Sequence, residues 1–167
     1  EPYFDVGYSN ESGLRELIQR AGSTMDQIEL DVERTLVDQF LQEVMKSNPK
    51  ATYGEIMIRS ALDQGAVSTL LLSESLNQRR TSFYCKDCKE VWEKTQLKTP
   101  ETGKCPVCDS DQVYEDEEKS MDLIDNLSLL AGHTSAQVRL ISLDTEEGAT
   151  LSSAFGGIAA LLRYPIS

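Results

Sequence analysis

Apolar side chains recur every three or four residues in several stretches of the chain. This is the spacing of one buried face of a helix, so each stretch predicts a helix. The expected helices cover residues 9–21, 29–46, 52–65, 120–132 and 149–155. After the third expected helix the apolar pattern also includes short continuous runs, which indicates that strands alternate with helices.

End signals support several of these helices. Gly22 is expected to end the first one, and Gly65 the third, because glycine adopts the left-handed conformation that follows a helix. Thr52 and Glu55 have the spacing of a capping box, in which each side chain bonds the other's backbone N–H. Ser120 is the expected cap of the fourth helix.

Three apolar runs predict strands, over residues 66–72, 137–143 and 158–164. The first has almost no polar alternation, as in a strand that is covered on both faces. Gly156-Gly157 lies before the last run and is expected to let the chain bend from helix to strand. Strands that alternate with helices predict an α/β domain with helices on both faces of the sheet.

Composition fits one globular domain with room for a small additional unit. Of the 167 residues, 40% are apolar and 26% charged, which argues against disorder. The longest apolar run is too short to span a membrane. The net charge of −12 repels phosphate backbones, so we expect little direct nucleic-acid binding. The start lacks both an initiator Met and a signal-peptide pattern, and is expected to be a cut from a longer chain.

All cysteines of the chain lie in one segment, as two C-x2-C pairs sixteen residues apart: Cys85, Cys88, Cys105 and Cys108. This spacing is typical of a zinc ribbon, in which four thiolates hold one structural Zn²⁺. Two disulfides are the alternative, disfavoured because a disulfide framework would not be confined to one paired cluster. Glycine is absent after each second cysteine, where Lys89 and Asp109 stand instead.

The metal segment interrupts the order of helices and strands, so residues 81–114 are interpreted as an insertion. Residues 109–118 then carry six acidic residues and no base. This acidic stretch is interpreted as a solvated connector, with an interaction site as the alternative.

No catalytic constellation can be assembled, so an enzyme is not expected. His133, the single histidine, stands at a predicted helix end without a Ser or Cys partner. Asp144, Glu146 and Glu147 suit the first turn of the last helix better than a carboxylate site. No phosphate-loop motif is present around Gly156-Gly157.

Several strings resemble the C-terminal domain of archaeal and eukaryotic class-one peptide chain release factors. They are YGE (53–55), ALDQGAV (61–67), TLLLS (69–73), TEEG (145–148) and AFGGIAALLRY (154–164). DVGY (5–8) and SGLREL (12–17) resemble the end of that family's central domain, and the cysteine insertion resembles the archaeal form.

The resemblance implies a three-layer α/β/α sandwich similar to the ribosomal-protein L30e fold. It implies a helical tail of the central domain over 1–48, and a partner-binding α/β domain over 49–80 and 115–167. It also implies cytoplasmic translation termination, with a translational GTPase, a ribosome-recycling ATPase and the ribosome as partners. The family's decoding domain and catalytic Gly-Gly-Gln loop are missing, because the single Gly-Gly precedes Ile158.

Two alternatives remain open beside the release factor. One is the related pelota-type ribosome-rescue factor, disfavoured because that family usually lacks the zinc ribbon. The other is an L30e-like RNA-binding module, which the acidic balance disfavours. The partner surface is a hypothesis only: acidic residues 115–118 and Glu146-Glu147 are candidates for meeting a basic patch.

Overall fold

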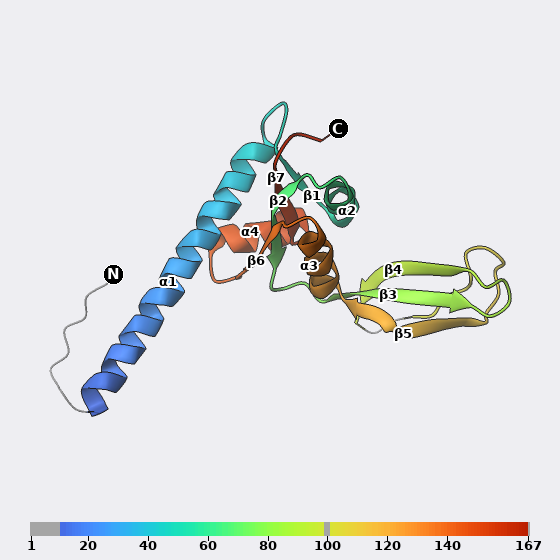
Figure 1. Cartoon of the computed structure of the whole chain (residues 1–167), viewed down its shortest axis with the longest axis horizontal. Helices are drawn as coiled ribbons and strands as arrows, with labels where there is room; N and C mark the ends of the chain where they lie inside the picture. Colours follow the sequence, from blue (N-terminus) through green and yellow to red (C-terminus); the bar gives the residue numbers. More distant parts are fainter. Residues whose placement is uncertain (1–10, 99–100, 167) are drawn as a thin grey trace.

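The computed structural model of the chain describes residues 11–98 and 101–166, and it is a mixed α/β structure (Figure 1). The helices pack against a four-stranded sheet, and a three-stranded sheet extends away from it. The DVGY string at 5–8 lies outside the described residues.

The four-stranded sheet has the order β1-β7-β2-β6. Its strands are β1 (Ala51–Tyr53), β7 (Ile158–Leu162), β2 (Val67–Ser73) and β6 (Gln137–Ile141). β2 and β6 are parallel, while β7 pairs antiparallel with both β1 and β2. The three strands predicted from apolar runs are confirmed. β1 was missed because its three residues fall in a stretch where the sequence offers only a helix-start signal.

Alternating side chains of this sheet enter two separate hydrophobic clusters. Leu70 and Ala160 lie in one cluster, with residues of α2 (Glu55–Asp63) and α3 (Leu123–His133). Leu71 lies in the other, with residues of α1 (Glu11–Val44) and α4 (Glu146–Phe155). Because successive residues of a strand point to opposite faces, each face of the sheet is covered by its own pair of helices.

The two helices predicted over 9–21 and 29–46 are one helix, α1. The prediction that Gly22 ends a helix is wrong: an added Cβ there would meet nothing within 4 Å, and the helix continues through it. A glycine inside a helix costs about 1 kcal/mol relative to alanine, which is too little to stop a long helix by itself. Val37 and Phe40 in the second half are fully buried against the sheet.

The predicted capping box at the start of α2 is also wrong. Thr52 pairs with Ala160 in the sheet, and Gly54, with φ 85°, takes the N-cap position without a side-chain bond. The backbone pairing of β1 with β7 holds Thr52 in an extended conformation, away from the cap position. Gly65, with φ 69°, follows the end of α2 as expected.

Ser120 does not cap α3, because it lies in β5 and Asp122 stands at the N-cap. The last helix, α4, begins at Glu146, before the expected start at Ala149. Glu146 and Glu147 form its first turn as expected, Asp144 lies outside it, and the Thr145 hydroxyl accepts the N–H of Gly148. Gly156, at φ 70°, ends α4 before β7, which confirms the predicted bend.

The second sheet has the order β4-β3-β5 and is antiparallel. Its strands are β3 (Gln78–Cys85), β4 (Val91–Leu97) and β5 (Val113–Asp122), so the sheet extends past the predicted insertion limits of 81 and 114 on both sides. The interpretation of residues 109–118 as a solvated connector is wrong for its second half, which is strand β5. Glu115 and Asp116 are held in this strand by pairing with Phe83 and Ser82 of β3.

Polar contacts join the base of this sheet to α2. Arg80 of β3 lies 3.5 Å from the Glu55 carboxylate and donates to the Thr95 hydroxyl of β4 at 3.0 Å. Thr95 in turn donates to Glu55. Glu55, which the sequence assigned to a capping box, therefore anchors the second sheet.

Candidate metal centre

Two turns of the same design carry the four cysteines at the far end of the three-stranded sheet. In one turn the N–H of Lys89 donates to the carbonyl of Cys85 at 3.0 Å, and in the other Asp109 donates to Cys105 at 3.0 Å. Lys89 and Asp109 have φ of 65° and 60°, in the left-handed region that glycine usually fills. The missing glycines therefore do not prevent the turns, although a side chain in this conformation costs about 1–2 kcal/mol.

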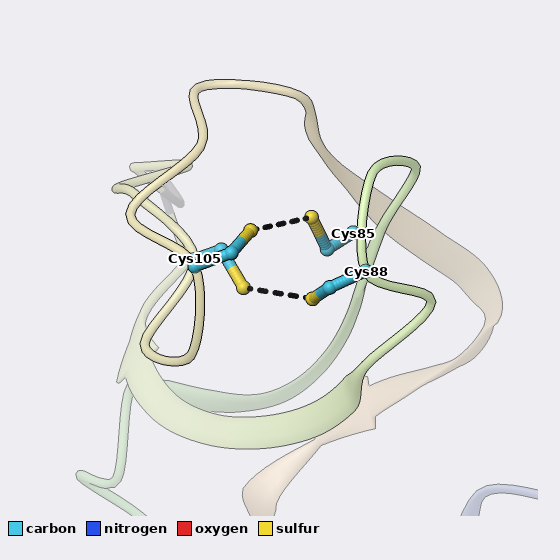
Figure 2. Close-up of side chains that lie close together, drawn as sticks. Cys85, Cys88 and Cys105 are labelled. Atoms are coloured by element: carbon cyan, nitrogen blue, oxygen red, sulfur yellow. Dashed lines mark hydrogen bonds between the residues drawn. The ribbon is translucent and has the colours of Figure 1, made fainter.

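The two turns point their sulfur atoms at one another. Figure 2 shows Cys85 and Cys88 on one turn facing Cys105 on the other. The Sγ of Cys85 lies 3.6 Å from that of Cys108, and Cys88 lies 3.5 Å from Cys105, so no disulfide joins them. All four sulfurs lie within 4.8 Å of one another and could hold a metal ion.

Burial, backbone N–H groups and neighbouring thiols together shift the pKa values of Cys105 and Cys108 in opposite directions. Desolvation raises the pKa of Cys105, but the backbone N–H groups of Cys108 and Val107 and the neighbouring thiols outweigh it and lower this pKa to about 7. The N–H of Ser110 lowers the pKa of Cys108, but desolvation and the other thiols raise it to about 12. Several thiolates cannot coexist here without a cation, so metal binding would release protons.

A small apolar cluster supports the turns from below. Cys85 and Cys105 are buried together with Phe83 and Val113, and the Trp92 ring stacks on Phe83 with centroids 5.8 Å apart. Four buried side chains are a small core for a protruding sheet. We therefore expect the stability of this sheet to depend on a link between the two cysteine turns, such as a metal ion bound by all four sulfurs.

Other candidate residues from the sequence do not form a site with the cysteines. His133 is exposed at the end of α3, and Glu147 lies 3.6 Å from Arg34 of α1. Among the helices in residues 11–98 and 101–166, none combines the length and the hydropathy that a membrane-spanning helix requires.

One feature near the acidic stretch was not visible in the sequence. Arg80 pairs with Met121 and Ser82 with Asp116, so residues 117–120 of β5 bulge out opposite Thr81 alone. The Ser120 hydroxyl fills the gap by accepting the Ser82 N–H and donating to the Asp116 carbonyl. The bulge presents Glu117 and Glu118 to solvent. Strand register depends on distant residues, so no local signal could have revealed it.

Comparisons with known proteins agree with the resemblance of the strings. Residues 30–166 match the family model described as eRF1 domain 3. The peptide chain release factor subunit 1 of Archaeoglobus fulgidus is 42% identical over 161 residues, which cover 96% of this chain and 39% of that protein. The chain thus spans about two fifths of the length of the curated relatives it matches.

Solved structures show the same fold. The C-terminal domain of a peptide chain release factor from Methanosarcina mazei has a TM-score of 0.82 at 37% identity, over 95% of this chain and 98% of that one. Archaeal pelota, in a model of ribosome-bound pelota and ABCE1, has a TM-score of 0.59 at 21% identity, over 98% of this chain and 35% of that one. Given the match over residues 30–166 and the release-factor relatives, this chain belongs to the eRF1 domain 3 family.

Proposed function

We propose that this chain is the partner-docking C-terminal domain of a translation termination factor, which directs release of the nascent peptide at stop codons. The observation that carries the proposal is the likeness of nearly the whole chain to an isolated release-factor C-terminal domain. Identity with that structure is 37%, against 21% with pelota, which favours the release factor over the rescue factor. The proposed site of action is the cytoplasmic ribosome.

The domain is proposed to be non-catalytic. Gly156-Gly157 precedes Ile158, and both glycines serve the turn between α4 and β7. The N–H of Gly157 donates to the Leu151 carbonyl, which ties this pair to the helix end. Its role is then to recruit a translational GTPase and later a ribosome-recycling ATPase, as the family resemblance implies.

This division of labour gives a first test. The chain alone should bind a translational GTPase of the elongation-factor type in a calorimetric titration. Its two hydrophobic clusters are made by its own residues, so the docking surface should stay folded without the rest of a longer protein. It should not release peptide from peptidyl-tRNA on a ribosome halted at a stop codon. Release by the chain alone, above a sample without protein, would contradict the assignment.

Charge offers a second test, at the β5 bulge. Glu115 is held by Arg79 at 3.1 Å, whereas Glu117 and Glu118 are exposed on the bulge. If they steer a basic partner, the double variant Glu117→Lys/Glu118→Lys should slow GTPase association several-fold, with a smaller change in dissociation. Raising salt should slow the wild type similarly, because charges are screened beyond about 8–10 Å.

Stopped-flow association rates measure both effects. A matched control is Glu101→Lys with Asp111→Lys, which makes the same charge change at exposed positions away from the bulge. An association rate that neither salt nor the bulge variant alters would place the docking surface elsewhere on the domain.

The metal is proposed to be one structural Zn²⁺ held by Cys85, Cys88, Cys105 and Cys108. Four sulfurs at the usual distance of about 2.3 Å from a tetrahedral zinc ion lie about 3.8 Å apart. The separations of 3.5 Å and 3.6 Å across the centre fit that geometry. Four thiolates leave no open position for water, so the proposed role is structural.

The finer architecture is part of the same proposal. We assign the four-stranded sheet and the helices packed on it to an L30e-like α/β/α sandwich, the three-stranded sheet between Gln78 and Asp122 to the zinc ribbon, and the first half of α1 to a helical tail of a central domain. The first half of α1 supports the last point. Its large apolar side chains follow one another at spacings of four, seven, three and four residues, which keeps them on one stripe, and they are exposed: Leu14, Ile18, Met25, Ile28 and Val32. Such a stripe is expected where another part of a longer protein packs.

A further inference from the structure

β6 leaves one edge of the four-stranded sheet open. It is the last strand in the order β1-β7-β2-β6, and within residues 11–98 and 101–166 only β2 pairs with it. Residues of α1 and of β6 line one cavity, so α1 lies beside this edge without filling the space next to it. An open strand edge presents unpaired N–H and C=O groups that can pair with another chain.

The direction of the backbone groups can be assigned. The Ile141 carbonyl accepts the N–H of Glu74, which follows β2, so Ile141 faces β2. Backbone groups alternate in direction along a strand, and therefore those of Val138 and Leu140 face the open edge. The next outward N–H, of Ser142, donates to the Glu33 carboxylate of α1 at 2.9 Å, which closes one end of the edge.

A groove runs along these groups. A cavity of about 260 Å³ is lined by residues 138–140 of β6 and by Glu29, Val32 and Glu33 of α1. Three consecutive strand residues include both faces, so the cavity follows the edge itself. A second cavity of about 370 Å³ shares Glu29, Glu33 and Leu140 with the first, so the two cavities adjoin, and together they are called the groove.

Negative charge dominates the groove. Its walls carry Asp26, Glu29, Glu33, Glu74 and Asp144. Glu33 and Glu74 accept backbone N–H groups of Ser142 and Leu143, which are neutral donors and leave the charges uncompensated. Arg139 is the single base among the lining residues.

The two faces of the edge differ in chemistry. Arg139 shares the face of Leu71, its pairing partner, on which α1 and its carboxylates lie. Leu140 lies on the opposite face, where it pairs with Leu72 and is 53% exposed. A strand added beside β6 would therefore point alternate side chains towards carboxylates and towards an exposed leucine.

We propose that this groove binds an extended protein segment in which Lys or Arg alternates with apolar residues, added as a fifth strand beside β6. Main-chain pairing with Val138 and Leu140 supplies affinity, and the alternating side chains supply specificity. This surface goes beyond the proposed function, since it requires neither a GTPase nor the ribosome.

The test uses a fluorescein-labelled heptapeptide in which lysine alternates with valine, titrated into the 167-residue chain by anisotropy. It should bind about tenfold more tightly than a peptide of the same composition with its lysines grouped. Equal affinity for the two would overturn strand addition, because it would show charge attraction alone. Amide resonances of Val138 and Leu140 should shift on binding.

N-methylated peptides test the backbone pairing without changing the protein. In an extended peptide the backbone N–H groups of the lysines point to one side and those of the valines to the other. Only one of these two sets can face β6, so N-methylation of that set should abolish binding and N-methylation of the other set should not. Equal effects of the two sets would overturn the proposal. The variant Asp26→Lys/Glu29→Lys should weaken binding about tenfold, and Arg139→Gln should strengthen it a few-fold.

A second copy of the chain is the competing occupant. Sedimentation at increasing protein concentration without peptide should show a monomer. NMR spectra over the same concentrations should show no shift of the Val138 and Leu140 amide resonances. A dimer that shifts these resonances, dissociated by Asp26→Lys/Glu29→Lys but not by the peptide, would assign the edge to self-association and overturn the proposal. Failure of peptide binding would leave GTPase binding by the chain untouched, so the two proposals are tested apart.

Discussion

Changing Cys105 to Ser should abolish binding of the proposed Zn²⁺ and unfold the end of the three-stranded sheet, while the helices and the four-stranded sheet stay folded. Structural zinc supplies about 10–16 kcal/mol in small zinc domains, whereas the apolar cluster under this site has only four buried residues. The larger clusters around β2 and β7 contain none of the cysteines. Elemental analysis should find about one equivalent of zinc in the wild type.

Trp92 makes the two units separately visible. It is the single tryptophan and stacks on Phe83 beneath the metal site, so its fluorescence reports the second sheet. Helical circular dichroism reports the other unit, to which α1, α2, α3 and α4 belong. In Cys105→Ser, or after chelation, the fluorescence transition should disappear while the dichroism transition remains.

A matched control is Val107→Ala in the same turn, whose side chain is 64% exposed and binds no metal. It should retain zinc and both transitions. Loss of both transitions in Cys105→Ser would show that the sheets form one cooperative unit through the Glu55–Arg80–Thr95 contacts. A metal-free protein with two disulfides would contradict the zinc site altogether.

Local chemistry could be predicted from the sequence, and long-range pairing could not. The cysteine turns were predictable because each C-x2-C forms within one turn, whatever the rest of the chain does. Thr52 and Ser120 carry signals that are common at helix starts, yet both lie in strands. Thr52 pairs with Ala160 of β7, and Ser120 lies in the bulge of β5, where its hydroxyl bonds the backbone of Ser82 and Asp116. In both cases contacts within a sheet outweigh a cap worth about 1 kcal/mol.

The open edge of β6 could not be predicted from the sequence either, because it also results from long-range pairing. Its apolar run predicts a strand but not which strand lies beside it, since the order of strands is set by the connections between them. Glu29 and Glu33 are more than a hundred residues from Val138 and Leu140, and only the packing of α1 against the sheet brings them together. A charge cluster of this kind cannot be found from spacing along the chain.

Changing Gly148 to Ala should destabilise the domain by about 3 kcal/mol or more. Gly148 is buried in the first turn of α4, and a Cβ there would lie 1.9 Å from the carbonyl oxygen of Ser142 and 2.9 Å from the Thr145 hydroxyl. Overpacking usually costs about 1–3 kcal/mol, and here the obstacle is backbone, which cannot rotate away. The Ser142 N–H is fixed at the same time by Glu33 of α1, so the loop has little freedom to yield.

The matched control is Gly132→Ala in α3, where an added Cβ meets nothing within 4 Å. That change should raise the free energy of unfolding by up to about 1 kcal/mol, because alanine is the better helix former. Urea unfolding followed by circular dichroism gives both values from the shift in midpoint at constant slope. The free energies of unfolding of Gly148→Ala and the wild type could instead differ by less than about 0.5 kcal/mol. That result would show that α4 can move away from Ser142, and that the close approach of this helix to the end of β6 does not require glycine at position 148.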